Sequence, residues 1–342
     1  MESRCLKVTV DGYPFSVPNL PLLAVTVGDP AGIGPEVTLA ALADRDVQKE
    51  SRALVLGPVS LRPASIPLWD DSRDPRQIEH QAWLSTYAPP RFEMGRAQAE
   101  CGRAALAALR RGVDLAMAHQ VDALVTAPVS KEALHLAGEK VEGQTELLGR
   151  WAGVTEHQMV AIAGPLRIML LTRHIPLRKA LDAITPERVL FHLKLLHSTL
   201  VDLGFERPRL ALAGINPHAG EGGILGSEEL ELFPEALGRA REAGIDVSGP
   251  LSPDTVFLAA FRGRYDGVLA QYHDQAFIAA KIAAPDTGLT LIAGLPFLRV
   301  SPAHGTAFDL AGKGLASAEN MKIALRQTAQ WALRRPAPAR AG

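Results

Sequence analysis

At 342 residues the chain is long enough for two domains or one large one, and its 47% apolar content can fill a substantial core. Its 36 basic and 37 acidic side chains nearly cancel, which argues against a nucleic-acid or membrane-surface role, since such proteins usually carry a basic excess. The two cysteines, Cys5 and Cys101, form neither a disulfide framework nor a zinc cluster. No signal-peptide pattern and no apolar run of membrane-spanning length is present, so a soluble, cytoplasmic protein is expected.

Apolar strands and helical stretches alternate along the chain, which is typical of an α/β fold around a mostly parallel sheet. Residues 58–92 are rich in proline, tryptophan and charge and are expected to run irregularly over the surface. The expected strands are 22–27, 53–57, 122–128, 159–163, 166–172, 210–213, 267–271 and 289–293. The expected helices are 37–43, 93–118, 185–203, 228–243 and 318–334.

No linker separates the halves of the sequence, so a second domain is expected to be interwoven with the first rather than appended to it. The expected division is an N-terminal extension at 1–21, a first α/β domain at 22–130 plus 285–335, a second at 131–284, and a flexible tail at 336–342.

Three histidines share one setting: His174, His218 and His273 each follow the end of an apolar strand. Because strand ends in a parallel sheet lie at one edge, their loops can converge there. Three imidazoles that leave one coordination position open suit a catalytic divalent metal. Asp274 and Glu221 are candidates to orient the imidazoles or to join the coordination. The alternative for each histidine alone is an ordinary loop residue.

A second group of candidates is cationic. Lys281 and Arg299 flank the strand at 289–293 and, with Lys131, can hold an anionic substrate, because arginine forms bidentate pairs and lysine acts as a point charge. Solvated surface charge is the alternative. The turn at 144–146 offers neutral hydrogen-bonding groups and a carboxylate, and it suits either substrate contact or a helix cap.

Six motifs occur in one order and together resemble the 4-hydroxythreonine-4-phosphate dehydrogenase family of pyridoxal phosphate biosynthesis, over about residues 22–333. The motifs are Gly28-Asp-Pro-Ala-Gly-Ile-Gly-Pro-Glu36, Thr126-Ala-Pro-Val129 with Lys131, Gly143-Gln-Thr-Glu146, Asn216-Pro-His-Ala-Gly-Glu-Gly-Gly223, Tyr272-His-Asp-Gln275, and Gly294-Leu-Pro-Phe297 with Arg299.

The resemblance implies a homodimer whose active site lies in a cleft between domains at the subunit interface. It implies a divalent metal (Zn2+, Mg2+, Mn2+ or Co2+) held by His174, His218 and His273. The implied reaction is an NAD- or NADP-linked oxidation of 4-phosphooxy-L-threonine to a β-keto acid, which decarboxylates to 3-amino-2-oxopropyl phosphate. Asp274, Lys131 and a metal-bound water are the candidate catalytic bases, and none is preferred. The implied substrate contacts are Gln144, Thr145, Lys281, Thr290 and Arg299.

The stretch 304–314 resembles the histidine-glycine loop that holds the adenosine of the cofactor in isopropylmalate and isocitrate dehydrogenases. The family shares that fold rather than the Rossmann fold, which agrees with the absence of a G-x-G-x-x-G motif. The cofactor-binding residues implied by the loop are His304, Gly305, Thr306, Ala307 and Asp309.

Two positions depart from the family pattern. Gln144 stands where histidine is usual, and Thr290 stands where asparagine is usual. Because of these departures, the alternative remains that the protein is a sister dehydrogenase that acts on a cis-dihydrodiol carboxylate or a sugar-acid phosphate. A phosphate acyltransferase-like enzyme of the same fold and a non-catalytic binding protein are alternatives from other classes.

Overall fold

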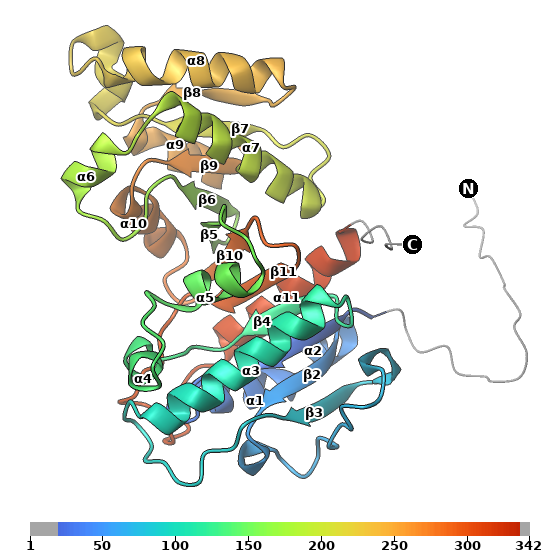
Figure 1. Cartoon of the computed structure of the whole chain (residues 1–342). Helices are drawn as coiled ribbons and strands as arrows, with labels where there is room; N and C mark the ends of the chain where they lie inside the picture. The colour runs from blue at the N-terminus through green and yellow to red at the C-terminus, as the bar shows by residue number, and fades with distance from the viewer. Residues whose placement is uncertain (1–19, 336–342) are drawn as a thin grey trace, which may run out of the picture.

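A single eleven-stranded sheet runs through the computed structural model, which describes residues 20–335 (Figure 1). The expected tail and all but the last two residues of the expected N-terminal extension lie outside this described part. The strands are β1 (Leu22–Thr26), β2 (Arg52–Gly57), β3 (Gln81–Ser85), β4 (Ala123–Thr126), β5 (Gln158–Ala163), β6 (Leu166–Leu170), β7 (Leu210–Ala213), β8 (Val247–Leu251), β9 (Gly267–Ala270), β10 (Leu289–Ala293) and β11 (Leu298–Pro302).

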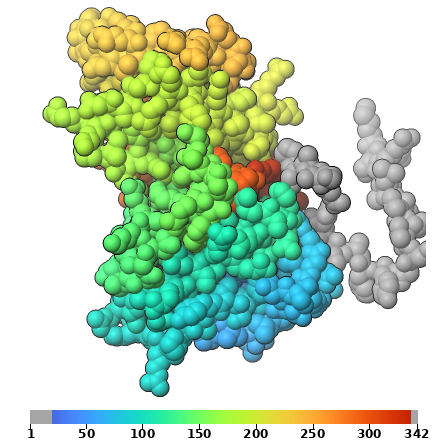
Figure 2. All heavy atoms as spheres, viewed as in Figure 1, coloured from blue at the N-terminus to red at the C-terminus, as the bar shows by residue number. Residues whose placement is uncertain are grey.

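The strand order is β3-β2-β1-β4-β11-β10-β5-β6-β9-β7-β8. Neighbours are parallel except at the centre, where β10 runs antiparallel to β11 and β5, and β5 runs antiparallel to β6. The expected α/β fold around a mostly parallel sheet is therefore confirmed. The C-terminal strand β11 lies beside β4, and β10 lies between β11 and β5, so the last strands of the chain enter the middle of the sheet. Figure 2 shows the orange and red C-terminal residues between the two ends of the molecule. The division into two domains stays a prediction.

Helices cover both faces of the sheet, because alternate strand residues point to opposite sides. Leu23 and Val25 of β1 pack in one apolar cluster with α1, α2, α7, α8 and α11. Leu22 and Ala24 pack on the other side with α3 and α5, and further along the same face α9 and α10 cover β6, β7 and β9. The helices are α1 (Gly34–Leu42), α2 (Arg45–Glu50), α3 (Ala99–Met117), α4 (Lys131–Leu136), α5 (Gln144–Trp151), α6 (Leu177–Asp182), α7 (Pro186–Asp202), α8 (Glu228–Glu242), α9 (Pro253–Phe261), α10 (His273–Ala283) and α11 (Glu319–Arg334), with short 3-10 turns η1 (Val59–Leu61), η2 (Pro75–Gln77) and η3 (Pro217–Gly223).

The expectation that residues 58–92 form only irregular surface is wrong, because β3 lies within them. Trp83 of β3 is fully buried, and its indole N–H donates to the carbonyl of Gly57 at 3.0 Å. The run Ala82 to Leu84 is too short to show a period-2 pattern, so only pairing with β2 reveals the strand. Helix α10 also begins at His273, where only a loop was expected. No helix among residues 20–335 is long and apolar enough to cross a lipid bilayer.

Gly102 lets α3 pass directly over α4, the helix that carries Lys131. A Cβ atom at Gly102 would overlap the carbonyl oxygen of Ala133, which belongs to the α4 backbone and has little freedom to move. Gly102→Ala is therefore expected to destabilise the protein by about 1–3 kcal/mol through overpacking. Gly238→Ala in α8 is the matched control, since nothing lies within 4 Å of its Cβ position and the change should instead stabilise by about 0.5–1 kcal/mol. Denaturant unfolding measures both, and equal effects would contradict the packing argument.

Candidate active site

Two of the three candidate metal ligands lie side by side at one edge of the sheet. His174 lies in the loop after β6, and His273 begins α10, which follows β9; these strands are parallel neighbours whose carboxyl ends meet. The centroids of the two imidazole rings are 5.3 Å apart. Asp274 accepts a hydrogen bond from Nδ1 of His273 at 2.7 Å, which leaves Nε2 of that ring with a free lone pair.

The surroundings of His174 favour its neutral form. Desolvation lowers the pKa of His174, and the positive charge of Lys131 lowers it further. Lys131 is held at this place because Ser130 caps α4 by accepting a hydrogen bond from the N–H of Ala133 at 3.1 Å. Neutral imidazole is the form that binds a metal, and Lys131 lies within electrostatic range of His174.

His218 lies on a different loop, whose backbone is left-handed. In η3 the residues from His218 to Gly222 all have positive φ, with φ 52° at His218. Such a conformation is costly for residues other than glycine and needs support from its surroundings. Glu229 of α8 gives that support: it is 2% exposed and accepts hydrogen bonds from the N–H groups of Ile215 at 2.7 Å and Asn216 at 2.6 Å. Sequence reasoning did not single out Glu229.

The donor set of one chain fits a divalent metal in part. Across residues 20–335, no three His, Cys, Asp or Glu side chains of the single chain come together as a metal-holding group. The pair of His174 and His273 supplies two of the nitrogen ligands that zinc-like ions prefer. His218 is not brought to this pair within one chain, so its role as third ligand stays a prediction.

Glu229 should make the stability of the His218 loop dependent on pH. Burial alone would raise the pKa of Glu229, but the hydrogen bonds from Asn216 and Ile215 lower it below its usual value of 4.5. Since the folded-state pKa is depressed, this stabilisation is present above pH 4.5 and is lost as the pH falls through the folded-state value.

Glu229→Gln is therefore expected to destabilise the protein by about 2–3 kcal/mol at pH 7, and by progressively less below pH 4.5. Thermal unfolding as a function of pH measures this difference. The neighbouring Glu228→Gln is the control, because Glu228 is exposed and accepts only from the side chain of Asn216. A deficit in Glu229→Gln that does not change with pH would contradict the assignment.

Arg299 is a buried cation that forms no ion pair with a carboxylate among residues 20–335. It lies on β11, is 2% exposed, and burial lowers its pKa to about 9, so it is still charged at neutral pH. Its Nη2 donates to the hydroxyl of Thr126 at 2.5 Å and to Oε1 of Gln144 at 3.0 Å. Its Nε is buried and has no hydrogen-bond partner among residues 20–335. A buried guanidinium whose hydrogen-bond acceptors are all neutral keeps its positive charge available for an anion.

The start of α5 adds backbone donors beside this arginine. Gln144 and the buried Thr145 open the helix, and no side chain caps it at Gly143, so its first N–H groups are available to a ligand. The next residue, Glu146, pairs with Arg173 at 3.3 Å, and Arg173 directly precedes His174. The structure therefore connects the predicted substrate residues of α5 to the histidine pair.

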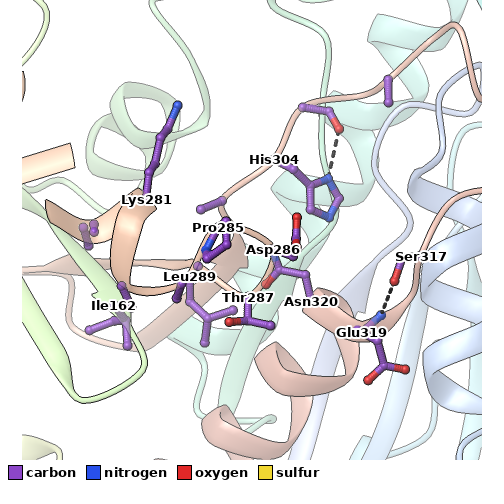
Figure 3. Close-up of a pocket in the computed structure, with 18 of the residues that line it drawn as sticks. Ile162, Lys281, Pro285, Asp286, Thr287, Leu289, His304, Ser317, Glu319 and Asn320 are labelled. Atoms are coloured by element: carbon purple, nitrogen blue, oxygen red, sulfur yellow. Dashed lines mark hydrogen bonds between the residues drawn. The ribbon is translucent and has the colours of Figure 1, made fainter. Parts of the chain in front are cut away.

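Thr290 is also brought to the face of the sheet that carries Arg299. It lies on β10 opposite Ser301 of β11, and Ser301 is two residues after Arg299, so all three side chains point to the same face. Lys281, by contrast, lies on α10 and lines a separate cavity together with His304 (Figure 3). Within one chain, the predicted substrate contacts are thus divided between two places.

That cavity has a volume of about 700 Å³, which is within the range of small-ligand sites. His304, Gly305 and Ala307 line it, as the predicted cofactor loop requires, whereas Thr306 uses its carbonyl to accept from the N–H of Ile33 at 3.0 Å and does not line it. Asp309 is exposed and also lies outside the lining.

Two polar atoms in this cavity lack partners among the described residues. They are Nε2 of His304 and Oδ1 of Asn320, both buried, and Figure 3 shows the two side chains at the same cavity. Asn320 is the second residue of α11 and is 7% exposed. Sequence reasoning did not identify it, because an asparagine at the start of a helix is usually a cap.

Comparisons with known proteins agree across most of the chain. A family model described as pyridoxal phosphate biosynthetic protein PdxA matches residues 36–328. The D-threonate 4-phosphate dehydrogenase of Salmonella typhimurium is 39% identical over 324 residues, which covers 91% of this chain and 98% of the relative. The 4-hydroxythreonine-4-phosphate dehydrogenase of Geobacter metallireducens is 37% identical over 331 residues, which covers 92% and 97%.

Solved structures give the same result. The structure of 4-hydroxythreonine-4-phosphate dehydrogenase from Klebsiella pneumoniae is similar to this chain with a TM-score of 0.83 and 36% identity, covering 93% of this chain and 99% of that one. A terephthalate 1,2-cis-dihydrodiol dehydrogenase from Burkholderia xenovorans is less similar, with a TM-score of 0.67 and 28% identity, covering 91% and 98%.

Proposed function

Because the chain belongs to the family described as pyridoxal phosphate biosynthetic protein PdxA, we propose that it oxidises the secondary alcohol of a four-carbon hydroxy acid with a terminal phosphate. The family resemblance and the dehydrogenase class that the motifs predict are both confirmed. The proposal further includes NAD or NADP as hydride acceptor, a divalent metal, and a cytoplasmic homodimer.

The observation that carries the proposal is the uncompensated charge of Arg299. A buried guanidinium with only neutral acceptors is costly unless a ligand supplies the anion. The adjacent N-terminus of α5 offers N–H groups that suit phosphate oxygens. Together they favour a phosphorylated substrate over the unphosphorylated carboxylate of a cis-dihydrodiol.

The residues at the sheet edge would then perform the oxidation. A divalent metal held by His174 and His273 of one chain, with His218 as the third ligand, would polarise the hydroxyl oxygen of the substrate. Asp274 keeps His273 in the tautomer whose Nε2 is free, so its role is to orient that ring. Lys131 forms no ion pair among the described residues, and in its uncharged form its amine would accept the proton of the alcohol.

A second subunit would complete this site. One chain brings His174 and His273 together but not His218, so we propose that His218 of the partner supplies the third ligand. The same arrangement would bring Lys281 of a partner to the phosphate. This would explain how Lys281 can be a substrate contact although it lies apart from Arg299 within one chain.

Two substrates fit this chemistry and differ at a single substituent. 4-Phosphooxy-L-threonine carries an amino group at C2, and D-threonate 4-phosphate carries a hydroxyl group there. The first is implied by the motifs, and the second is favoured by the name of the Salmonella relative. It also fits the sugar-acid phosphate alternative that Gln144 and Thr290 keep open.

The test is the formation of reduced nicotinamide with each substrate, after chelation and again after addition of Zn2+, Mg2+, Mn2+ or Co2+. One of the two should be oxidised only when metal is present. The first would yield 3-amino-2-oxopropyl phosphate and the second dihydroxyacetone phosphate, since each β-keto acid loses carbon dioxide. No oxidation of either with NAD or NADP, at any metal, would refute the proposal.

A further inference from the structure

The side-chain amide of Gln144 forms hydrogen bonds through both its oxygen and its nitrogen. Its Oε1 accepts from Nη2 of Arg299 at 3.0 Å, and its Nε2 donates to the carbonyl of Ala127 at 3.1 Å. Rotation of the amide by half a turn would place N–H against N–H and oxygen against oxygen. The two contacts therefore fix the orientation of the amide.

The partners of Arg299 are all neutral. Thr126 offers a hydroxyl and Gln144 an amide carbonyl, and among residues 20–335 no carboxylate forms an ion pair with this guanidinium. A carboxylate at position 144 would be nearly isosteric, but it would neutralise Arg299 and compete with an incoming anion. Neutral acceptors orient the guanidinium and leave its charge for the ligand.

We propose that Gln144 is a positioning residue that holds Arg299 through a neutral acceptor, so that the buried guanidinium keeps its full charge for the terminal phosphate of the substrate. This inference rests on the proposed function and deepens it. It gives Gln144 a role through Arg299, and it explains how glutamine can replace the usual histidine without loss of the anion site, since either side chain can accept a hydrogen bond from arginine.

The test is binding of inorganic phosphate, measured by calorimetry on the full-length protein, with Gln144→Glu, Gln144→Met and Gln144→His compared to the original chain. Gln144→Glu should weaken phosphate binding at least tenfold, Gln144→Met should weaken it less, and Gln144→His should retain the phosphate affinity of the original chain. In turnover, Gln144→Glu should raise KM for the phosphorylated substrate more than it lowers kcat.

Gln81→Glu is the matched control, because Gln81 also donates its amide to a backbone carbonyl, that of Leu42 at 2.7 Å, and lies on β3, four strands from β11. It should leave phosphate binding unchanged. Phosphate binding by a folded Gln144→Glu variant that equals the original, or absence of phosphate binding by the original chain, would overturn the inference. Phosphate binding that depends on Gln144, without turnover of either phosphorylated acid, would instead refute the proposed function and leave the anion site in place.

Discussion

Arg299→Met should raise KM for the phosphorylated substrate roughly one hundredfold, whereas KM for the same acid without its phosphate should change little. The physical reason is the loss of charge-assisted hydrogen bonds to phosphate, each of which contributes about 1.5–3 kcal/mol. The variant should fold, because it removes a buried charge that has no carboxylate partner and keeps an apolar side chain of similar length.

Steady-state kinetics with matched phosphorylated and unphosphorylated acids measures this effect. Arg167→Met is the control. Arg167 is partly buried, donates to the backbone carbonyls of Pro165 and Asp266, and has an Nε without a partner among residues 20–335, but it lies at the opposite end of its strand from His174. That change should affect stability without affecting KM. Equal changes in KM for both acids in Arg299→Met would remove the assigned role of Arg299 in phosphate binding.

His218→Ala should lower turnover by about a thousandfold or more and leave the fold largely intact. The loop that carries His218 is exposed and contributes little to the core, whereas loss of a metal ligand forfeits several kcal/mol of stabilisation of the developing negative charge. Turnover and metal content after chelation and metal addition measure the effect. His80→Ala is the control, since His80 is exposed and lies beside the edge strand β3. A His218→Ala protein that remains active after rigorous metal removal would exclude the metal role.

The same variant tests whether the site is shared between subunits. Mixing His174→Ala with His218→Ala protein and allowing the subunits to exchange should restore about one quarter of the original activity, because half of the dimers would be mixed and each would contain one complete site of two. If all three histidines acted within one chain, no mixed dimer would contain a complete site. Activity that stays at the level of the separate variants would therefore contradict the shared site.

The sequence by itself determined the fold class, the family and the main set of chemical groups. Apolar runs predicted eight of the eleven strands, because buried parallel strands need continuous apolar stretches, but they missed β3, β8 and β11. The positions of His174 and His273 followed from the same rule, since parallel neighbours end at one edge and bring their following residues together. The glycine-rich motifs identified the family because backbone that must approach a ligand tolerates few side chains.

What only the tertiary structure decided depends on contacts between residues far apart in the chain. Gln144 and Arg299 are 155 residues apart, and no spacing rule shows that they share a hydrogen bond or that no carboxylate joins them. Glu229 looks like an ordinary acidic residue in the first turn of a helix until its burial beneath the His218 loop is seen. The strand at Trp83 is visible only through pairing with β2. Local sequence patterns show which residues follow a strand, but they do not show which distant loops meet. For this reason the sequence did not reveal that His218 is separate from the other two histidines within one chain.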